Sequence, residues 1–260
     1  MNGQCVAVVS GKGGVGKSML VAALGAHFAY HRKRTLLVDL NTGMRGLDML
    51  LGLESRIVFD LGDVQDGLCG IEQALIEDRQ TGVFLLAARQ ITDTDALDAE
   101  ALGRLMREMT KRFDRVLLDV PGGIGAHLQM AAGAAGEALV VTTPDDAAMR
   151  GAERVAGALR DIPSPGLVIN RIREDFVEAG LQYPPEVCGQ VLDMRVTGVV
   201  PEDGEVWRRV LSRQAINGDF PAAWAIRNLM ERMDDESTPL RPWRKDAAGK
   251  QKRGFFGSPR

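Results

Sequence analysis

Two lysines and a serine near the start of the chain stand at spacings suited to holding phosphate groups. Residues 11–18 read Gly-Lys-Gly-Gly-Val-Gly-Lys-Ser, which satisfies the phosphate-loop pattern G-x-x-x-x-G-K-[ST]. Glycines let the backbone wrap closely and point successive N–H groups at phosphate oxygens. Lys17 then supplies charge at the β- and γ-phosphates, and the Ser18 hydroxyl is able to ligate Mg²⁺. The predicted phosphate-binding residues are Gly11, Lys12, Gly13, Gly14, Val15, Gly16, Lys17 and Ser18.

The segments on either side of this loop have the character that a phosphate loop needs. Val6 to Val9 form an apolar run that predicts a buried strand, and a helical pattern follows from about Ser18 to His31. Strand, glycine-rich turn and helix in this order place the positive end of the helix dipole at the anion. The alternative, a glycine-rich turn that carries a surface lysine, leaves these flanking elements unexplained.

Apolar runs and helical stretches alternate along the rest of the chain. This alternation predicts an α/β fold, a doubly wound and mostly parallel sheet with helices on both faces. Active groups of such sheets gather at the carboxyl ends of the strands, where Gly11, Asp39, Asp119 and Pro144 fall. Further strands are predicted at 35–38, 83–86, 115–118, 138–141, 167–169 and 196–200, and further helices at 101–113, 147–159 and 222–233.

Asp119 ends the apolar strand 115–118 and is followed by the glycine-rich run 121–125. We interpret it as a Walker B carboxylate that holds Mg²⁺ or a water bound to it. The glycine-rich run is suited to a loop that moves with the γ-phosphate. An aspartate that only caps the next helix is the other interpretation, and the phosphate loop favours the metal role.

Composition narrows the class of protein. The 260 residues suffice for one large α/β domain, and the net charge of −3 argues against a protein that coats nucleic acid. Three widely spaced cysteines indicate a reducing compartment, and His27 and His31 lack a third metal ligand. The start resembles no signal peptide, and no apolar run approaches about 20 residues. We therefore expect a cytoplasmic protein whose cysteines, Cys5, Cys69 and Cys188, are core residues.

The composition changes near the end of the chain. We predict a phosphate-loop domain over 1–233, a flexible linker over 234–249 and a basic, aromatic tail over 250–260. The last twenty residues hold seven Lys or Arg and one Asp, a net charge of +6, and they include Phe255 and Phe256. Basic charge beside aromatic rings suits an anionic membrane surface. A solvated tail without a partner is an equally good reading of the composition.

These motifs together resemble the MinD family of bacterial cell-division ATPases, over roughly residues 4–233. Lys12, directly after the first glycine, is typical of the deviant Walker A motif of that family. The tail with Gly-Phe-Phe-Gly is similar to a shortened form of its membrane-targeting helix. The other matching segments are 39–52 (switch I), 73–79 (the next helix), 119–124 (switch II), 141–144 (a strand end), 169–171 (with Asn170 at the adenine) and 198–203 (the base loop, with Pro201 and Asp203).

The resemblance implies an ATP-dependent cycle. Two subunits sandwich two ATP molecules, and Lys12 reaches the partner's phosphates. Mg²⁺ is held by Ser18, Asp39 and Asp119. The ATP-bound homodimer presents two tails to the membrane, and two weak contacts acting together bind more tightly than one. The dimer also binds a MinC-like inhibitor of septation. A topological regulator stimulates hydrolysis. The implied location is cytoplasmic and peripheral on the inner face of the cell membrane.

The chain departs from the family pattern in three places. Asn41 stands where the family has an aspartate that positions the attacking water; an amide binds water but accepts no proton. We therefore predict slow ATP hydrolysis, with Lys12, Lys17 and Asn41 as the catalytic set. Gly151 stands where the family has an aspartate, which removes a charged partner from the dimer or regulator face. The tail lacks apolar residues that would lengthen the stripe of Phe255 and Phe256.

Other functions stay open on the sequence. A catalytically weak, ATP-dependent dimeric scaffold is favoured by Asn41 and Gly151. A flagellar-number regulator of the same superfamily usually has an N-terminal extension, whereas here the strand begins at Gln4. A partitioning ATPase needs a basic face on the folded body, and the basic charge that we localise lies in the tail, so no nucleic-acid partner is expected. Arg89 and Trp207 belong to no motif.

Overall fold

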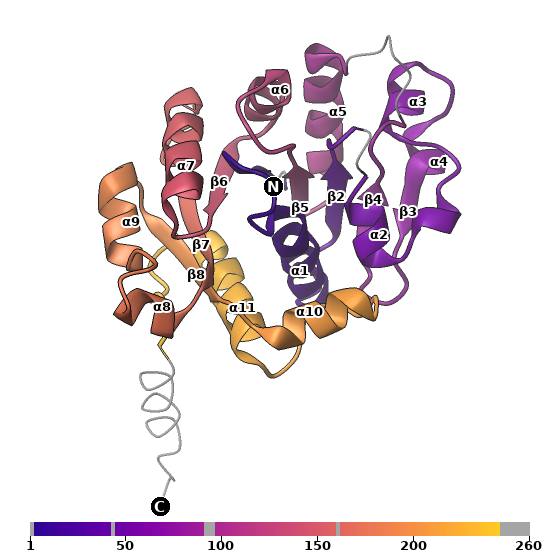
Figure 1. Cartoon of the computed structure of the whole chain (residues 1–260). Coiled ribbons are helices and arrows are strands. Elements are labelled where there is room, and N and C mark those ends of the chain that lie inside the picture. The colour runs from indigo at the N-terminus through magenta and orange to yellow at the C-terminus, as the bar shows by residue number, and fades with distance from the viewer. Residues whose placement is uncertain (1–2, 43–44, 91–96, 160–161, 245–260) are drawn as a thin grey trace, which may run out of the picture.

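The computed structural model describes residues 3–42, 45–90, 97–159 and 162–244 (Figure 1). The predicted tail, 250–260, and residues 245–249 of the predicted linker lie outside these residues. The strands are β1 (Gln4–Val9), β2 (Thr35–Asp39), β3 (Leu75–Glu77), β4 (Phe84–Leu86), β5 (Arg115–Asp119), β6 (Glu137–Thr142), β7 (Gly166–Ile172) and β8 (Val196–Pro201). The helices are α1 (Lys17–Tyr30), α2 (Leu47–Leu51), α3 (Leu61–Gln65), α4 (Ile71–Ala74), α5 (Ala99–Arg112), α6 (Ala126–Ala134), α7 (Asp146–Ala158), α8 (Glu174–Glu178), α9 (Pro185–Leu192), α10 (Gly204–Leu211) and α11 (Pro221–Asp234), with a 3₁₀ turn at Glu54–Arg56.

The strands form one sheet in the order β3-β4-β2-β5-β1-β6-β7-β8. All pairings between described strands are parallel except that of β3 with β4. The seven strands predicted from the apolar runs are confirmed, and so is the doubly wound, mostly parallel α/β class. Buried runs such as Val6–Val9 follow from this architecture, because helices cover both faces of a parallel sheet.

The structure corrects the expectation for residues 73–79. The family resemblance predicts a helix there, but the chain makes one helical turn in α4 and then enters β3. Leu75 and Ile76 pair with Leu86 and Leu85 in antiparallel register at the edge of the sheet. The pairing covers the otherwise open edge of β4, and this strand pairing outweighs the local helical preference of the sequence.

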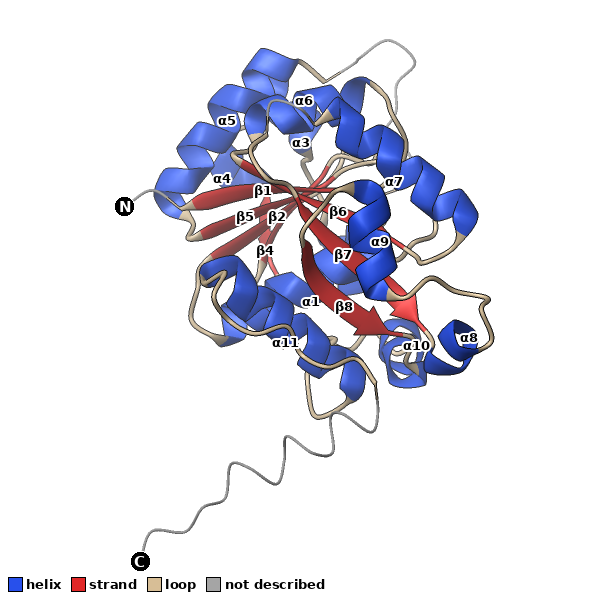
Figure 2. Ribbon diagram, turned by 90° about the vertical axis from the view of Figure 1, so that its left-hand side faces the viewer, coloured by secondary structure: helices blue, strands red, loops and turns tan. Residues whose placement is uncertain are grey.

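Helices cover the sheet in two layers, as Figure 2 shows edge on. One core packs beneath α5, α6, α7 and α9, and the other beneath α1, α2 and α11. Helix α1 is apolar on nearly all sides, and ten of its fourteen residues are buried. A helix of this kind must be enclosed all round, here between the sheet and α11. This burial fixes the position of the loop that precedes α1.

The register of the sheet brings two carboxylates together. Asp39 and Asp119 are Cα partners at the carboxyl ends of β2 and β5. Val8 of β1 pairs with Asp119 on the other side, so the loop after β1 emerges beside both. Three segments far apart in sequence therefore converge at one edge of the sheet, where the alternation of strands and helices predicted the active groups.

The first part of the predicted linker is attached to the folded domain. Asn228 of α11 donates to the carbonyl of Pro239 at 3.0 Å and accepts from the N–H of Arg241 at 2.8 Å. Leu240 and Trp243 pack against the core. Residues 234–244 of the predicted linker are thus held by contacts that composition does not reveal.

The remaining composition-based expectations concern thiols, histidines and membrane spans. All three cysteines are free, and Cys5 and Cys188 are buried. Burial raises the pKa of the Cys5 thiol to about 12. Within the described ranges no three His, Cys, Asp or Glu side chains cluster to hold a metal. In the same part of the chain, every helix is too short or too polar to span a bilayer.

His27 gives the domain a pH-dependent stability. It is buried on α1, its Nε2 has no hydrogen-bond partner, and burial lowers its pKa from 6.5 to about 4, with smaller effects of Arg227 and His31. Because the unfolded chain binds the proton first as the pH falls below 6.5, the free energy of unfolding decreases there. Between pH 7 and pH 5 we expect a loss of about 2 kcal/mol from this residue. Urea unfolding at both pH values should show a smaller loss in His27→Gln.

The control for this prediction is His31→Gln, which changes the exposed histidine that directly follows α1. It should keep most of the pH dependence of the unmodified protein. Equal losses in the unmodified protein and in His27→Gln would contradict the assignment.

Candidate nucleotide-binding site

The loop between β1 and α1 has the backbone of a phosphate cradle. Gly14 and Gly16 take left-handed φ angles of 81° and 85°, which suit glycine. A Cβ on Gly16 would lie 2.4 Å from the Nδ2 atom of Asn170, so no side chain fits there. Helix α1 starts immediately afterwards at Lys17, and its first N–H groups have no partner within the helix. The geometry supports the predicted anion site.

Lys17 is buried and forms an ion pair with the carboxylate of Asp119, which is itself fully buried. The pair joins the start of α1 to the end of β5. A buried ammonium needs a partner of opposite charge, and Asp119 supplies it. The two residues predicted for phosphate charge and for the metal therefore lie in contact.

Asp39 anchors the segment that follows β2. One carboxylate oxygen accepts from the N–H of Asn41 at 2.8 Å, and the other accepts from the N–H groups of Gly46 at 3.1 Å and Leu47 at 3.2 Å. Burial and the neighbouring Asp119 raise its pKa to about 6. The carboxylate thus fixes the start of α2. Its raised pKa reflects its burial first and the second carboxylate beside it next.

The residues fit a bound Mg²⁺. The Oδ2 atom of Asp119 is buried without a hydrogen-bond partner, and Asp39 lies beside it in register. Mg²⁺ commonly takes one or two carboxylates and completes its shell with phosphate oxygens and water, so a larger cluster of protein ligands is not required. The Ser18 hydroxyl belongs to the loop that would hold those phosphates.

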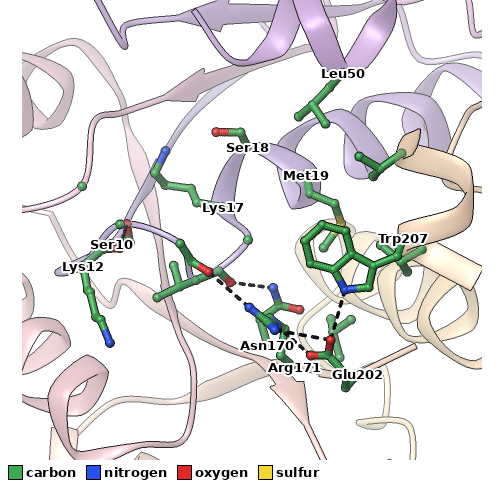
Figure 3. Close-up of a pocket in the computed structure, with 18 of the residues that line it drawn as sticks. Ser10, Lys12, Lys17, Ser18, Met19, Leu50, Asn170, Arg171, Glu202 and Trp207 are labelled. Carbon is green, nitrogen blue, oxygen red and sulfur yellow. Dashed lines mark hydrogen bonds and ion pairs between the residues drawn. The ribbon is translucent and has the colours of Figure 1, made fainter. Parts of the chain in front are cut away.

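A cavity of about 340 Å³ runs from this loop toward the end of β8. Figure 3 shows its lining, with Lys17 and Ser18 at one end and Trp207 at the other. Asn170 is buried in its wall and donates to the carbonyl of Val15 at 2.7 Å. The other predicted site residues in the lining are Lys12, Gly13, Gly14, Val15, Gly16, Asn41, Pro201 and Asp203; Gly11, Asp39 and Asp119 are absent from it.

Asp203 has a structural task within that lining. Its carboxylate accepts from the N–H of Glu205 at 2.9 Å, which caps α10, and from the N–H of Ala222 at 3.2 Å, in α11. Both carboxylate oxygens are used by the backbone, so the geometry supports Asp203 as an organiser of the wall more than as a direct ligand.

Sequence reasoning missed the far wall of the cavity. Helix α10 contributes Val206, Trp207 and Val210. Their positions, one and four residues apart, lie on one face of a helix, a signal that the sequence contains but that no motif marks. The remaining unpredicted lining residues are Ser10, Met19, Leu50, Gly122, Arg171, Val200 and Glu202.

Lys12 differs sharply from Lys17 in its surroundings. Its side chain is 52% exposed, whereas that of Lys17 is 8% exposed. The Nζ atom of Lys12 lies 4.0 Å from an Oδ1 atom of Asp145, the residue that caps α7. Solvent screening leaves little strength in such an exposed pair. Lys12 is therefore held only loosely within its own subunit.

Gly151 lies directly against the phosphate loop. A Cβ on Gly11 would lie 1.9 Å from the carbonyl carbon of Gly151, and a Cβ on Gly151 would lie 2.9 Å from that of Gly11. Neither backbone leaves room for a side chain unless α7 shifts. The close packing of α7 on the loop thus explains why residue 151 is glycine. This reason is separate from the loss of charge predicted from the sequence.

Comparison with known proteins agrees with this site. The model of the CobQ/CobB/MinD/ParA nucleotide-binding domain matches residues 6–216. The septum site-determining protein MinD of Bacillus subtilis is 36% identical over an alignment of 264 positions, which covers 98% of this chain and 98% of its own. This chain belongs to the MinD family. MinD of Escherichia coli is 31% identical, over 97% of this chain and 98% of its own.

A solved MinD structure confirms the family at the level of the fold. The MinC:MinD complex of Aquifex aeolicus contains a chain that superposes with a TM-score of 0.85 and 34% identity, covering 92% of this chain and 98% of that one. The resemblance inferred from the motifs is thereby confirmed. MinD proteins are nucleotide-binding P-loop ATPases, and the cavity described above lies where the P-loop of this chain opens.

Proposed function

We propose that this chain binds ATP with Mg²⁺ in the cavity between the phosphate loop and α10. Backbone N–H groups of residues 13–18 and the Lys17 ammonium bind the phosphates. Ser18, Asp39 and Asp119 hold Mg²⁺, which when bound neutralises phosphate charge. The proposal is supported by three features that lie together at one edge of the sheet: a glycine cradle, a buried lysine and an unpartnered carboxylate oxygen.

The same site works as half of a dimer. The observation that carries this proposal is the contrast between the two lysines of the loop, one buried on Asp119 and one exposed. A single nucleotide needs Lys17 alone. Lys12 faces outward from a loop that binds polyanions, and a second subunit placed face to face brings its phosphates within reach. The dimer forms only with ATP because the γ-phosphate completes the partner's site.

Hydrolysis is slow in this account. Asn41 lines the cavity, and its amide positions a water without accepting a proton from it. Phosphoryl transfer depends mostly on positioning and electrostatics, so Lys12, Lys17 and Asn41 still support turnover.

Asn41→Asp should therefore raise the turnover number about tenfold. A well-placed general base contributes on the order of 100-fold or more, and the Asn41 amide already supplies part of this effect by positioning the water. The measurement is phosphate release at saturating ATP and Mg²⁺. Asn41→Ala, which neither binds nor deprotonates the water, is the matched control and should be slower than the unmodified protein. Equal rates for Asn41→Asp and the unmodified protein would show that another group performs this task.

Membrane contact and partner binding complete the proposed cycle. The ATP dimer presents two copies of the tail 250–260 to an anionic membrane, and it recruits a MinC-like inhibitor of septation; the Aquifex relative was solved with MinC. A topological regulator ends the cycle by stimulating hydrolysis. The protein is then peripheral on the inner face of the cell membrane during the ATP-bound phase and cytoplasmic after release.

Deletion of residues 250–260 should weaken ATP-dependent binding to anionic vesicles at least about tenfold. The deleted segment holds four basic residues and two phenylalanines, and a basic residue at such a surface contributes on the order of 1 kcal/mol. Co-sedimentation with anionic and with uncharged vesicles measures the effect, and the uncharged vesicles are the control. Unchanged pelleting of the truncated chain would show that the tail does not contribute to membrane binding.

A second candidate is a catalytically weak scaffold that uses ATP only to hold a dimer. Asn41 and the glycine at 151 favour it. A flagellar-number regulator receives less support, because the relatives described above are septum site-determining proteins. The experiment that separates enzyme from scaffold is the ATPase rate with and without phospholipid vesicles. A rate that vesicles stimulate supports the cycling enzyme, and ATP binding without turnover supports the scaffold.

A further inference from the structure

Trp207 forms the wall of the cavity opposite the phosphate loop (Figure 3). It lies on α10 and remains 53% exposed. A tryptophan kept for packing alone is usually more deeply buried. This ring instead presents a large aromatic surface at the end of a cavity whose other end is built for phosphates.

The orientation of the ring is fixed by a chain of polar contacts. The indole Nε1–H donates to Glu202 at 3.3 Å, and Glu202 pairs with Arg171 at 2.6 Å. Arg171 also reaches the carbonyl of Gly14 at 3.5 Å, and its guanidinium lies 6.0 Å from the centre of the indole ring. Arg171 holds a left-handed φ of 59°, which is uncommon for a residue with a side chain. The indole is thus tied to the phosphate loop itself.

Apolar side chains line the cavity together with Trp207. They are Met19 of α1, Leu50 of α2 and Val206 and Val210 of α10. The cavity therefore offers N–H groups and Lys17 at the glycine loop, and an aromatic ring with apolar side chains and the Glu202–Arg171 pair toward its other end. A ligand that fits both ends carries a polyphosphate at one end and a flat aromatic group at the other.

We propose that Trp207 stacks on the base of the bound nucleotide and makes the site selective for nucleotides over inorganic polyphosphate. The proposal rests on the nucleotide binding proposed above and adds a residue that no motif of the family marked. Stacking on an aromatic side chain tolerates any base, and it is strong enough to change affinity by roughly 5-fold to 100-fold. Trp207 is in this account a specificity residue for the base end of the ligand.

The intrinsic fluorescence of Trp207 tests the proposal directly. The chain has three tryptophans, and Trp224 and Trp243 line a different cavity. A variant with Trp224→Phe and Trp243→Phe leaves Trp207 as the only reporter. ADP with Mg²⁺ should quench its emission, whereas tripolyphosphate with Mg²⁺ should bind without quenching. Displacement of tripolyphosphate by ADP in calorimetry shows that both occupy one site.

The affinity measurement separates stacking from a change in the loop. Trp207→Ala should weaken ADP binding about tenfold and leave tripolyphosphate binding within about twofold, because the phosphates do not touch the ring. Trp207→Phe keeps an aromatic face and should retain most of the affinity. Circular dichroism confirms that each variant is folded, and the fluorescence titration, which leaves Trp207 in place, tests the proposal if the alanine variant does not fold.

Three outcomes would overturn the proposal, each in its own way. ADP that binds by calorimetry without altering the emission shows that the base lies elsewhere, and nucleotide binding itself stands. No ADP binding to the unmodified protein removes the proposed function together with this inference. A change in emission that ATP causes, that ADP does not cause and that is lost in Lys12→Ala, while that variant still binds ATP, shows that the indole lies at the seam between subunits and does not contact the base.

Discussion

Replacement of Lys17 by alanine is expected to weaken ATP binding at least about 100-fold, the largest effect of any single change in this chain. Lys17 is the buried cation of the phosphate loop, and charge-assisted hydrogen bonds to phosphate are among the strongest that a side chain makes. Loss of two such bonds accounts for a factor of this size. Calorimetry with ATP in the presence and absence of Mg²⁺ measures the loss.

The control must separate binding from folding, because Lys17 also neutralises buried Asp119. Leaving that carboxylate unpaired costs about 3–5 kcal/mol of stability. Lys17→Ala combined with Asp119→Asn removes both charges and should recover much of the stability. In EDTA, Asp119→Asn alone should bind ATP and the double variant should not. ATP binding by the double variant would contradict the assignment of the loop.

Lys12→Ala is expected to separate ATP binding from dimerisation. Because the Lys12 side chain is exposed and its ion pair within the described part of the chain is a loose one, with Asp145 at 4.0 Å, its loss should leave the fold intact and ATP affinity within about threefold, the range of a weak surface contact. The variant should nevertheless remain a monomer in ATP, since the partner's phosphates lose their cation. Light scattering coupled to size exclusion measures the mass in ATP and in ADP.

Asp145→Asn is the matched control for this variant. Asparagine caps a helix nearly as well as aspartate, so α7 keeps its start while Lys12 loses its partner within the subunit. The control should dimerise at the same ATP concentration or a lower one. A dimer of Lys12→Ala in ATP would show that the exposed lysine does not join the subunits.

The parts of this account that the sequence predicted share a physical origin. The phosphate loop, Asp39 and Asp119 are fixed by local rules, namely glycine at left-handed angles and polar residues at the ends of apolar strands. Their meeting in space follows from the parallel pairing of β2 and β5; alternation implies a parallel sheet but does not say which strands are neighbours. Asn170 lies in the wall of the cavity, against the loop, and its contact with adenine stays a prediction.

The parts that could not be predicted depend on tertiary contacts, some between segments close in the chain and some between distant ones. β3 exists because β4 offers an open edge, and residues 234–244 are held by the side chain of Asn228. Gly11 and Gly151 meet because α7 lies on the loop. Trp207 enters the cavity only because Asp203 caps α10 and so sets where that helix begins. None of these relations leaves a pattern in the local sequence.

The central claim is that two copies of this chain close around two ATP molecules. It is tested most directly by light scattering of the unmodified protein at saturating ATP and Mg²⁺, with ADP as the reference. We predict about twice the chain mass of 28.2 kDa in ATP and the single mass in ADP. A single mass in both nucleotides, with ATP shown by calorimetry to be bound, would contradict it.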